Sequence, residues 1–276
     1  MRTVFVLAVR EFRDGFRNKW VVATAALLAA LALTLSFVGN APTGELAADP
    51  LELLVVGLSS LTTFLVPLIA LLLSYDAVVG EHERGTLLLL LAYPVVRWQV
   101  LLGKFAGHVA ILALATAAGY GSAGAVLGFK HGFAALAGWG AFAALIGTST
   151  LLGVAFLALG YLISTSVRER GAAAGLAVTA WLLLVVIFDL ALLGVLVADQ
   201  GKHLSGSVVG ALILFNPADA YRVLNLTGSD KIQLLSGLVG LDPGARPSAA
   251  ALATALSAWA LVPLAAACLR FSRRPI

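Results

Sequence analysis

Residues 171–197 read GAAAGLAVTAWLLLVVIFDLALLGVLV, an apolar run that contains one charged residue, Asp189. The hydrocarbon core of a bilayer is about 30 Å thick, so an α-helix needs about 20 apolar residues to cross it. This run is long enough and apolar enough to do so. It therefore predicts a transmembrane helix.

The composition of the whole chain agrees with this prediction. Of its 276 residues, 61% are hydrophobic and 12% are charged, and the mean hydropathy is +0.99. Soluble globular domains have about 45–50% apolar and about 25% charged residues. A soluble enzyme, a nucleic-acid-binding protein and a disordered scaffold are therefore excluded, and we expect a lipid bilayer around the chain and no nucleic acid as a partner.

Six stretches are long enough to cross a membrane, which predicts an all-α polytopic membrane protein. An N-terminal segment, 1–20, precedes them, and the whole chain, 1–276, is predicted to form a single transmembrane domain. The six predicted spans cover about 21–38, 53–75, 105–129, 135–163, 171–197 and 248–269.

The distribution of basic residues predicts the orientation of the spans. If the N-terminus lies in the cytoplasm, most of the 18 lysines and arginines fall in cytoplasmic segments. The positive-inside rule therefore places both termini in the cytoplasm. The basic residues that remain outside are Lys130, Lys202, Arg222, Lys231 and Arg246.

Residues 1–20 predict an amphipathic elbow helix that lies in the membrane interface before the first span. One face carries the aromatic residues Phe5, Phe12, Phe16 and Trp20, and the opposite face carries Arg10, Arg13, Asp14 and Arg17. We take Phe12, Arg13, Phe16 and Arg17 as the candidate functional residues. The helix is either a membrane anchor alone or also a contact for a cytoplasmic partner.

Asp189 is the one acid well inside a predicted span. An intramembrane carboxylate is a functional candidate by default. At 1.5 Å per residue, however, Asp189 lies about 27 Å from Gly171, close to the outer interface. This position favours a helix-end acid paired with an outer arginine or lysine over a proton or cation relay, which would need several such groups at mid-depth.

Glycine motifs in the chain predict helix packing rather than nucleotide binding. Gly119, Gly121 and Gly124 spell G-x-G-x-x-G, but they lie inside a span with no strand before them. Such small residues, like the pairs Gly103/Gly107 and Gly171/Gly175, let membrane helices approach closely.

The sequence contains no recognisable phosphate-binding loop and no catalytic constellation. The chain is therefore predicted to be non-catalytic, and if ATP drives it, the ATPase is another polypeptide. His82 lies between Glu81 and Glu83, but neighbouring residues on a helix point about 100° apart and cannot easily close on one metal ion.

The most informative cytoplasmic stretch follows the second span. Gly85 can end a helix, five leucines follow at 87–91 where water is expected, and Pro94 can begin another helix. A short apolar helix in this position is unfavourable unless a partner protein or the membrane interface covers it. We therefore interpret 80–104 as a region that couples to a partner; the alternative is a re-entrant or interfacial loop without one. The candidate contact residues are Glu81, Glu83, Arg84, Gly85, Thr86, Leu87, Leu88, Leu90, Pro94 and Arg97.

The residues at 83–87, 92–95 and 97–104 resemble the coupling-helix region of exporter-type ABC transporter permeases. The resemblance implies a subunit of the bacterial inner membrane that works as a dimer with a second copy of itself. It also implies separate cytoplasmic ABC ATPase subunits that bind ATP and Mg, with no cofactor in this chain.

Within that family, the segments at 10–20 and 215–222 resemble permeases of the systems that mature nitrous oxide reductase. This resemblance implies a NosF-like ATPase, a NosD-like periplasmic repeat protein and copper-site assembly. The long outer segment 199–247 would then be the docking platform, or alternatively a lid over the dimer. The candidate docking residues are Asn216, Pro217, Asp219, Tyr221 and Arg222.

The residue types in the spans disfavour copper as the species that crosses. Copper prefers soft ligands such as cysteine, methionine and histidine. The predicted spans contain only His108 and Cys268, both near the inner end. Either another small species is exported, for example one that contains sulfur, or no solute crosses and movement passes to the outer partner. A generic ABC exporter of lipids or small molecules and a secondary transporter are the remaining alternatives.

Overall fold

The computed structural model describes residues 2–17, 19–38, 50–92, 95–133, 138–199, 205–226 and 247–273, and these residues form helices joined by turns. The first part of the chain contains α1 (Arg2–Arg17), α2 (Lys19–Val38), α3 (Pro50–Ser74), α4 (Val79–Glu83), α5 (Thr86–Leu91), α6 (Arg97–His131) and α7 (Trp139–Ser166). The second part contains α8 (Arg170–Trp181), the π-helix η1 (Leu182–Ile187), α9 (Phe188–Asp199), α10 (Gly206–Leu214), α11 (Pro217–Leu226) and α13 (Ala249–Arg273).

Five of the predicted spans form helices that are long and apolar enough to cross a bilayer. They are Pro50–Glu83, Arg97–His131, Trp139–Ser166, Arg170–Asp199 and Ala249–Arg273. The first predicted span lies in α2, where the apolar part that is described is the shorter stretch Ala25–Phe37. The all-α membrane fold is therefore confirmed, whereas the sixth span and the orientation stay predictions.

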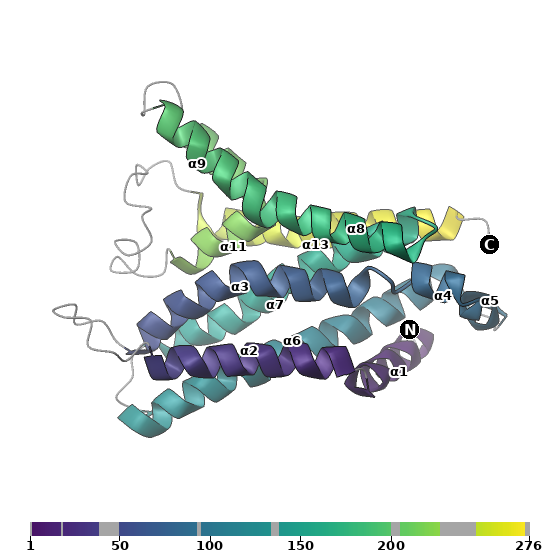
Figure 1. Ribbon diagram of the computed structural model, residues 1–276, viewed down its shortest axis with the longest axis horizontal. Helices are drawn as coiled ribbons and strands as arrows, with labels where there is room; N and C mark the ends of the chain where they lie inside the picture. The colour runs from purple at the N-terminus through teal and green to yellow at the C-terminus, as the bar shows by residue number, and fades with distance from the viewer. Residues whose placement is uncertain are drawn as a thin grey trace.

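The long helices run side by side, and the molecule has two ends (Figure 1). α1, α4, α5 and the last turns of α13 lie at one end, which we call the α5 end. α9 lies at the other, which we call the α9 end. The fifth span, α8–η1–α9, starts at the α5 end and diverges from the other helices towards the α9 end. None of the residues of α9, all of which are described, is buried.

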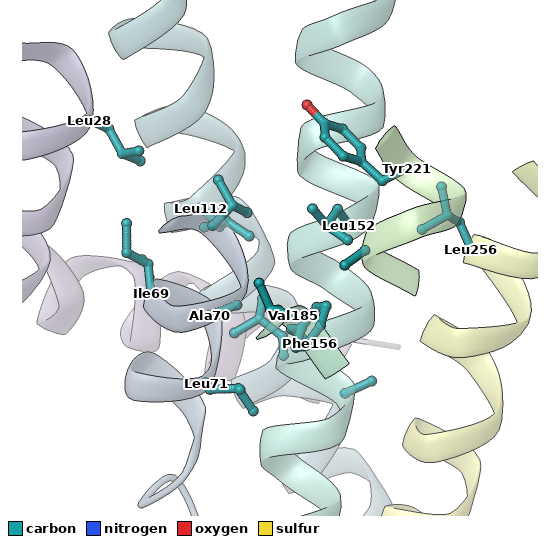
Figure 2. Packing of buried hydrophobic residues seen from close by; sticks show 14 of the residues in the cluster. Leu28, Ile69, Ala70, Leu71, Leu112, Leu152, Phe156, Val185, Tyr221 and Leu256 are labelled. Carbon is teal, nitrogen blue, oxygen red and sulfur yellow. The ribbon is translucent and has the colours of Figure 1, made fainter. Parts of the chain in front are cut away.

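Leucine, phenylalanine and tyrosine side chains fill the centre of the bundle (Figure 2). Leu112, Leu152 and Phe156 are at most 1% exposed. Because lipid tails are as apolar as a protein core, van der Waals contact and hydrogen bonds stabilise such packing between membrane helices. The short helix α11 is part of this core: Tyr221 is fully buried, and its hydroxyl lies 2.9 Å from Ser149 Oγ of α7.

Two glycines let α1 approach α6 closely. A Cβ atom at Gly107 would lie 2.9 Å from the Ala8 carbonyl oxygen, and one at Gly103 would overlap the same helix. The close packing predicted for this pair is therefore confirmed. For Gly171 and Gly175 the prediction is wrong within this chain, since no other described part of it comes within 4 Å of their Cβ positions.

The contact between α1 and α6 generates a first prediction. Gly107→Val should push α1 off α6 and lower the free energy of unfolding by about 1–3 kcal/mol, the usual effect of overpacking. Gly121→Val is the matched control on the same helix, because space at Gly121 is open. Thermal unfolding in detergent measures both variants, and equal midpoints would contradict the close contact.

Candidate functional site

The α4–α5 hairpin, which connects α3 to α6, is fixed at its base and closed by its own turn. The N–H groups of residues 78–79 both donate to Ser164 Oγ of α7, at 3.0 and 3.1 Å. Gly85, with a φ of 71°, takes the left-handed conformation that favours glycine. Across this turn, the Thr86 hydroxyl donates to the Glu81 carbonyl at 3.3 Å.

The leucines at 87–90 of α5 divide into a buried and an exposed set. Leu87 is 2% exposed and packs into the bundle, and Leu90 is partly buried against it. Leu88 and Leu89 are 60% and 69% exposed. The prediction of Leu87 as a contact residue is therefore wrong, because its side chain is not accessible to a partner. Leu89 is accessible, although it was not among the predicted contact residues.

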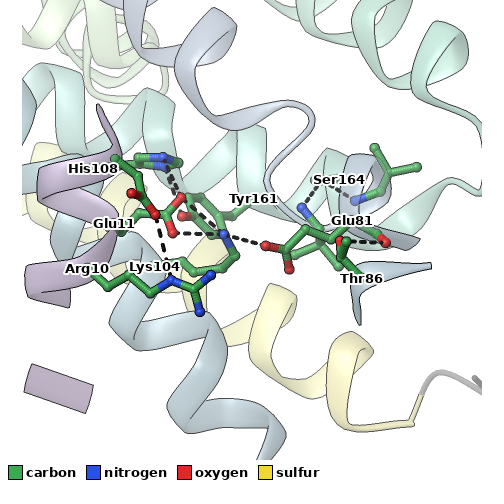
Figure 3. Close-up of polar contacts among 11 residues, drawn as sticks. Arg10, Glu11, Glu81, Thr86, Lys104, His108, Tyr161 and Ser164 are labelled. Atoms are coloured by element: carbon green, nitrogen blue, oxygen red, sulfur yellow. Dashed lines mark hydrogen bonds and ion pairs between the residues drawn. The ribbon is translucent and has the colours of Figure 1, made fainter. Parts of the chain in front are cut away.

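A buried cation lies directly behind the hairpin (Figure 3). The Lys104 ammonium of α6 contacts both carboxylate oxygens of Glu11 in α1, at 3.0 and 2.9 Å, and Glu81 Oε1 in α4, at 3.1 Å. The Lys104 side chain is only 8% exposed. His108 Nε2 lies 3.3 Å from Glu11, and its Nδ1 lies 2.9 Å from the Tyr161 hydroxyl. Three separate elements thus meet at one charge.

The electrostatics of this cluster keep Glu11 ionised. Burial alone would raise the pKa of the Glu11 carboxyl, but the hydrogen bond from His108 and the charge of Lys104 lower that pKa from 4.5 to about 2. Because the folded-state pKa lies below the ordinary value, the stabilisation is complete above pH 4.5. It is lost only as the pH falls towards about 2.

The hairpin also holds the start of the fifth span. Glu83 accepts a hydrogen bond from the Arg170 N–H at 2.6 Å, and Arg170 Nη2 lies 3.0 Å from Asp76 Oδ2. Glu81 and Glu83, predicted as contacts for a partner, therefore join parts of this chain to one another. Arg84 is exposed.

The two remaining residues predicted in the coupling region lie beyond the hairpin. Arg97 begins α6 and donates to the carbonyls of Phe271 and Ser272 in α13, each at 3.4 Å. Pro94 lies outside the described residues. Arg97 thus joins the start of α6 to α13.

A helix, α1, is present where the elbow helix was predicted, but its position in the membrane interface stays a prediction. It contacts α6 through a face that carries none of the predicted elbow residues. This face carries Leu7, Ala8 and Glu11, which lie against Gly103, Gly107 and Lys104. Of the predicted elbow residues, Phe12 is half-buried and Arg13 is exposed. The side chains of Phe16 and Arg17 lie outside the described part.

A second charged cluster joins the fifth span to α11. Arg222 donates to both carboxylate oxygens of Asp189, at 2.6 and 2.7 Å, and to Asp219 Oδ1 at 2.8 Å. The predicted pairing of Asp189 with an arginine or lysine is confirmed. Asp189 is not a helix-end acid, because the helical span continues to Asp199, and its outer position stays a prediction. The same contacts show that Arg222 and Asp219, predicted to dock a periplasmic partner, bind within the chain.

The other predicted docking residues are also turned inward, so they offer no contact surface in this structure. Asn216 and Tyr221 are at most 1% exposed, and Pro217 is buried. Asn216 caps α11, because its Oδ1 accepts a hydrogen bond from the Ala218 N–H at 2.9 Å, and Pro217 takes the first helical position. An asparagine followed by a proline is a helix start that can be recognised in the sequence.

No group of three histidine, cysteine, aspartate or glutamate residues in the described ranges could hold a metal ion. Both ring nitrogens of His108 already have protein partners, Glu11 and Tyr161. The described contacts therefore assign His108 to the buried cluster.

The Lys104 cluster generates a second prediction. Lys104→Met leaves two partly buried carboxylates, Glu11 and Glu81, without the ammonium that pairs with them. It should lower the free energy of unfolding by up to about 3 kcal/mol, the low end of the cost of breaking a buried ion pair. Adding Glu11→Gln and Glu81→Gln should recover much of the loss. Arg10→Gln is the matched control, since it breaks an exposed pair with Asp14 worth about 0.2–1 kcal/mol. Denaturant unfolding in detergent measures all four proteins, and no recovery in the triple variant would contradict the assignment.

Comparisons with known proteins agree with this arrangement. The profile of the ABC-2 family transporter proteins matches residues 5–275. The probable ABC transporter permease protein NosY of Pseudomonas aeruginosa is 48% identical over 277 residues, which is 100% of both chains. The protein of the same name from Stutzerimonas stutzeri is 44% identical over 275 residues, 99% of both chains. The chain therefore belongs to the ABC-2 family of transporter proteins, and it is similar to NosY permeases along its whole length.

Proposed function

We propose that this permease is the membrane subunit of an ATP-driven complex of the bacterial inner membrane, in which the α4–α5 hairpin binds a separate, NosF-like ABC ATPase. ATP hydrolysis on that subunit would move the hairpin. The movement would pass through the spans either to a transported solute or to a periplasmic partner.

The observation that carries the proposal is the pair of exposed leucines on a fixed support. Leu88 and Leu89 project from the α5 arm of a hairpin whose base is bonded to Ser164 and whose α4 arm is backed by Lys104. Burial of each leucine in a partner's groove would contribute about 1.5–3 kcal/mol. Because the support is rigid, a displacement of the leucines is transmitted to α1, α6 and α7 and is not absorbed by a flexible loop.

The charge distribution supports a cytoplasmic α5 end. The helix ends that lie there carry several basic residues: Arg10 in α1, Arg84 after α4, and Arg97, Arg170 and Arg270 at the start of α6, the start of α8 and the last turns of α13. An excess of basic residues is typical of cytoplasmic segments. The α9 end would then face the periplasm and a NosD-like partner, with maturation of the copper site of nitrous oxide reductase as the purpose of the complex.

The fifth span supports a dimer with a second copy of the chain. In the most apolar 18-residue stretch of this span, only 6% of the residues are buried within the chain. Gly171 and Gly175 leave open space on it. Small residues of this kind allow close contact between membrane helices, so a second copy would complete the packing that they lack here.

We propose that copper does not pass through this subunit. His108 is engaged by Glu11 and Tyr161, and Cys268 is a single thiol on α13. The described spans thus offer no chain of free soft ligands. This favours transmission of movement, or export of another small species, over copper transport. A generic ABC exporter of a lipid or small molecule would use the same hairpin.

The exposed leucines generate a third prediction. Leu88→Asp and Leu89→Asp should each abolish co-purification of the permease with its ATPase, because a carboxylate would be buried in the apolar contact. Phe129→Asp, an equally apolar-to-acidic change at an exposed site of the α9 end, is the matched control. Retention of the ATPase by both leucine variants would rule out the hairpin as its binding site.

A further inference from the structure

The fifth span connects the two ends of the molecule (Figure 1). At the α5 end, its first residue, Arg170, is bonded to Glu83 and Asp76 beside the hairpin. At the α9 end, the span diverges from the bundle, and α9 has no buried residue among its described positions. Its attachment to the rest of the chain must therefore be found between these two regions.

One attachment lies at the π-helix. The wider turn of a π-helix interrupts regular α-helical bonding, and such turns are common at functional sites. Within η1, the Leu184 carbonyl accepts a hydrogen bond from Asn216 Nδ2 at 2.6 Å. Asn216 is 1% exposed and also caps α11. A single amide thus binds the backbone of the fifth span and the start of α11.

The second attachment lies about two turns further along α11. Arg222 donates two hydrogen bonds to Asp189, the second residue of α9, and one to Asp219 of its own helix. The Asp219 side chain is 3% exposed, and its Oδ2 has no hydrogen-bond partner among the residues that the structure describes. Because a buried carboxylate needs a nearby cation, Asp219 holds the guanidinium at the position where it meets Asp189.

α11 is in turn fixed to the bundle. The Tyr221 hydroxyl lies 2.9 Å from Ser149 Oγ, and the Thr148 hydroxyl donates to Asn225 Oδ1 at 2.9 Å. Both partners lie on α7, the helix whose other end binds the hairpin through Ser164. α11 is therefore a rigid body placed between α7 and the fifth span.

We propose that Asp189, Asn216, Asp219 and Arg222 form a clamp that joins η1 and α9 to α11, so that the outer half of the fifth span and α11 move as one body. The inference deepens the proposed coupling function and rests on it for the source of the movement. Within it, Asp189 and Asn216 are positioning residues: they determine which outer element follows the fifth span.

The test measures the distance between α9 and α11 with spin labels in nanodiscs. Labels replace Val197 on α9 and Phe215 next to α11, which are 68% and 76% exposed, in a Cys268→Ala background. The clamped protein should give one narrow distance distribution. Asp189→Asn combined with Asn216→Ser should broaden it and lengthen its mean. These changes leave Arg222 paired with Asp219, and serine still caps α11, so α11 keeps its fold.

Asp14→Asn is the matched control, because Asp14 is a carboxylate paired with an exposed arginine at the α5 end. With the ATPase and ATP added, the distance should stay constant in the clamped protein and change in the double variant. The proposal would be overturned if the distance distributions of the clamped protein and the double variant had equal widths. A distance that changes with nucleotide in the clamped protein would also overturn it. If the ATPase does not bind, the proposed function fails, whereas the nucleotide-free distances still decide the clamp.

Discussion

Lys104 is a buried cation held between two carboxylates from different elements, and the position of the α4–α5 hairpin depends on it. A charge of this kind is stable in a low-dielectric site only while its partners remain in place. Glu11 and Glu81 therefore cannot separate from Lys104 without a large cost. This constraint joins α1, α6 and the α4–α5 hairpin into one unit. It supports α5, a helix of only six residues from which two leucines project.

A rigid unit at one end of a membrane protein is useful only if its displacement reaches the other end. The structure contains two connections of that kind. α7 binds the hairpin through Ser164 and binds α11 through Ser149. The fifth span begins at Arg170, which donates a hydrogen bond to Glu83 of the hairpin, and meets α11 at Asp189. Both connections converge on α11, so this short buried helix, rather than an exposed platform, is the element through which the outer segment would be moved.

Hydropathy and helix length were sufficient to predict most of the fold from the sequence, because crossing a bilayer needs a long apolar helix. The depth of Asp189 also predicted the kind of partner it has. Sequence periodicity could not identify the Lys104 contacts, because Glu11 lies 93 residues away. It also could not tell that Leu87 is buried and Leu89 exposed, since the hairpin's contact with α7 decides which side of α5 faces the bundle.

Site-specific photocrosslinking of the permease to its ATPase tests the central claim most directly. A photoreactive residue is placed in turn at Leu87, Leu88, Leu89 and Phe129, and the complex is irradiated in membranes. The structure predicts strong adducts from Leu88 and Leu89, which are exposed at the α5 end, and none from buried Leu87 or from Phe129 at the α9 end. Adducts from Phe129, or none from either exposed leucine, would contradict it.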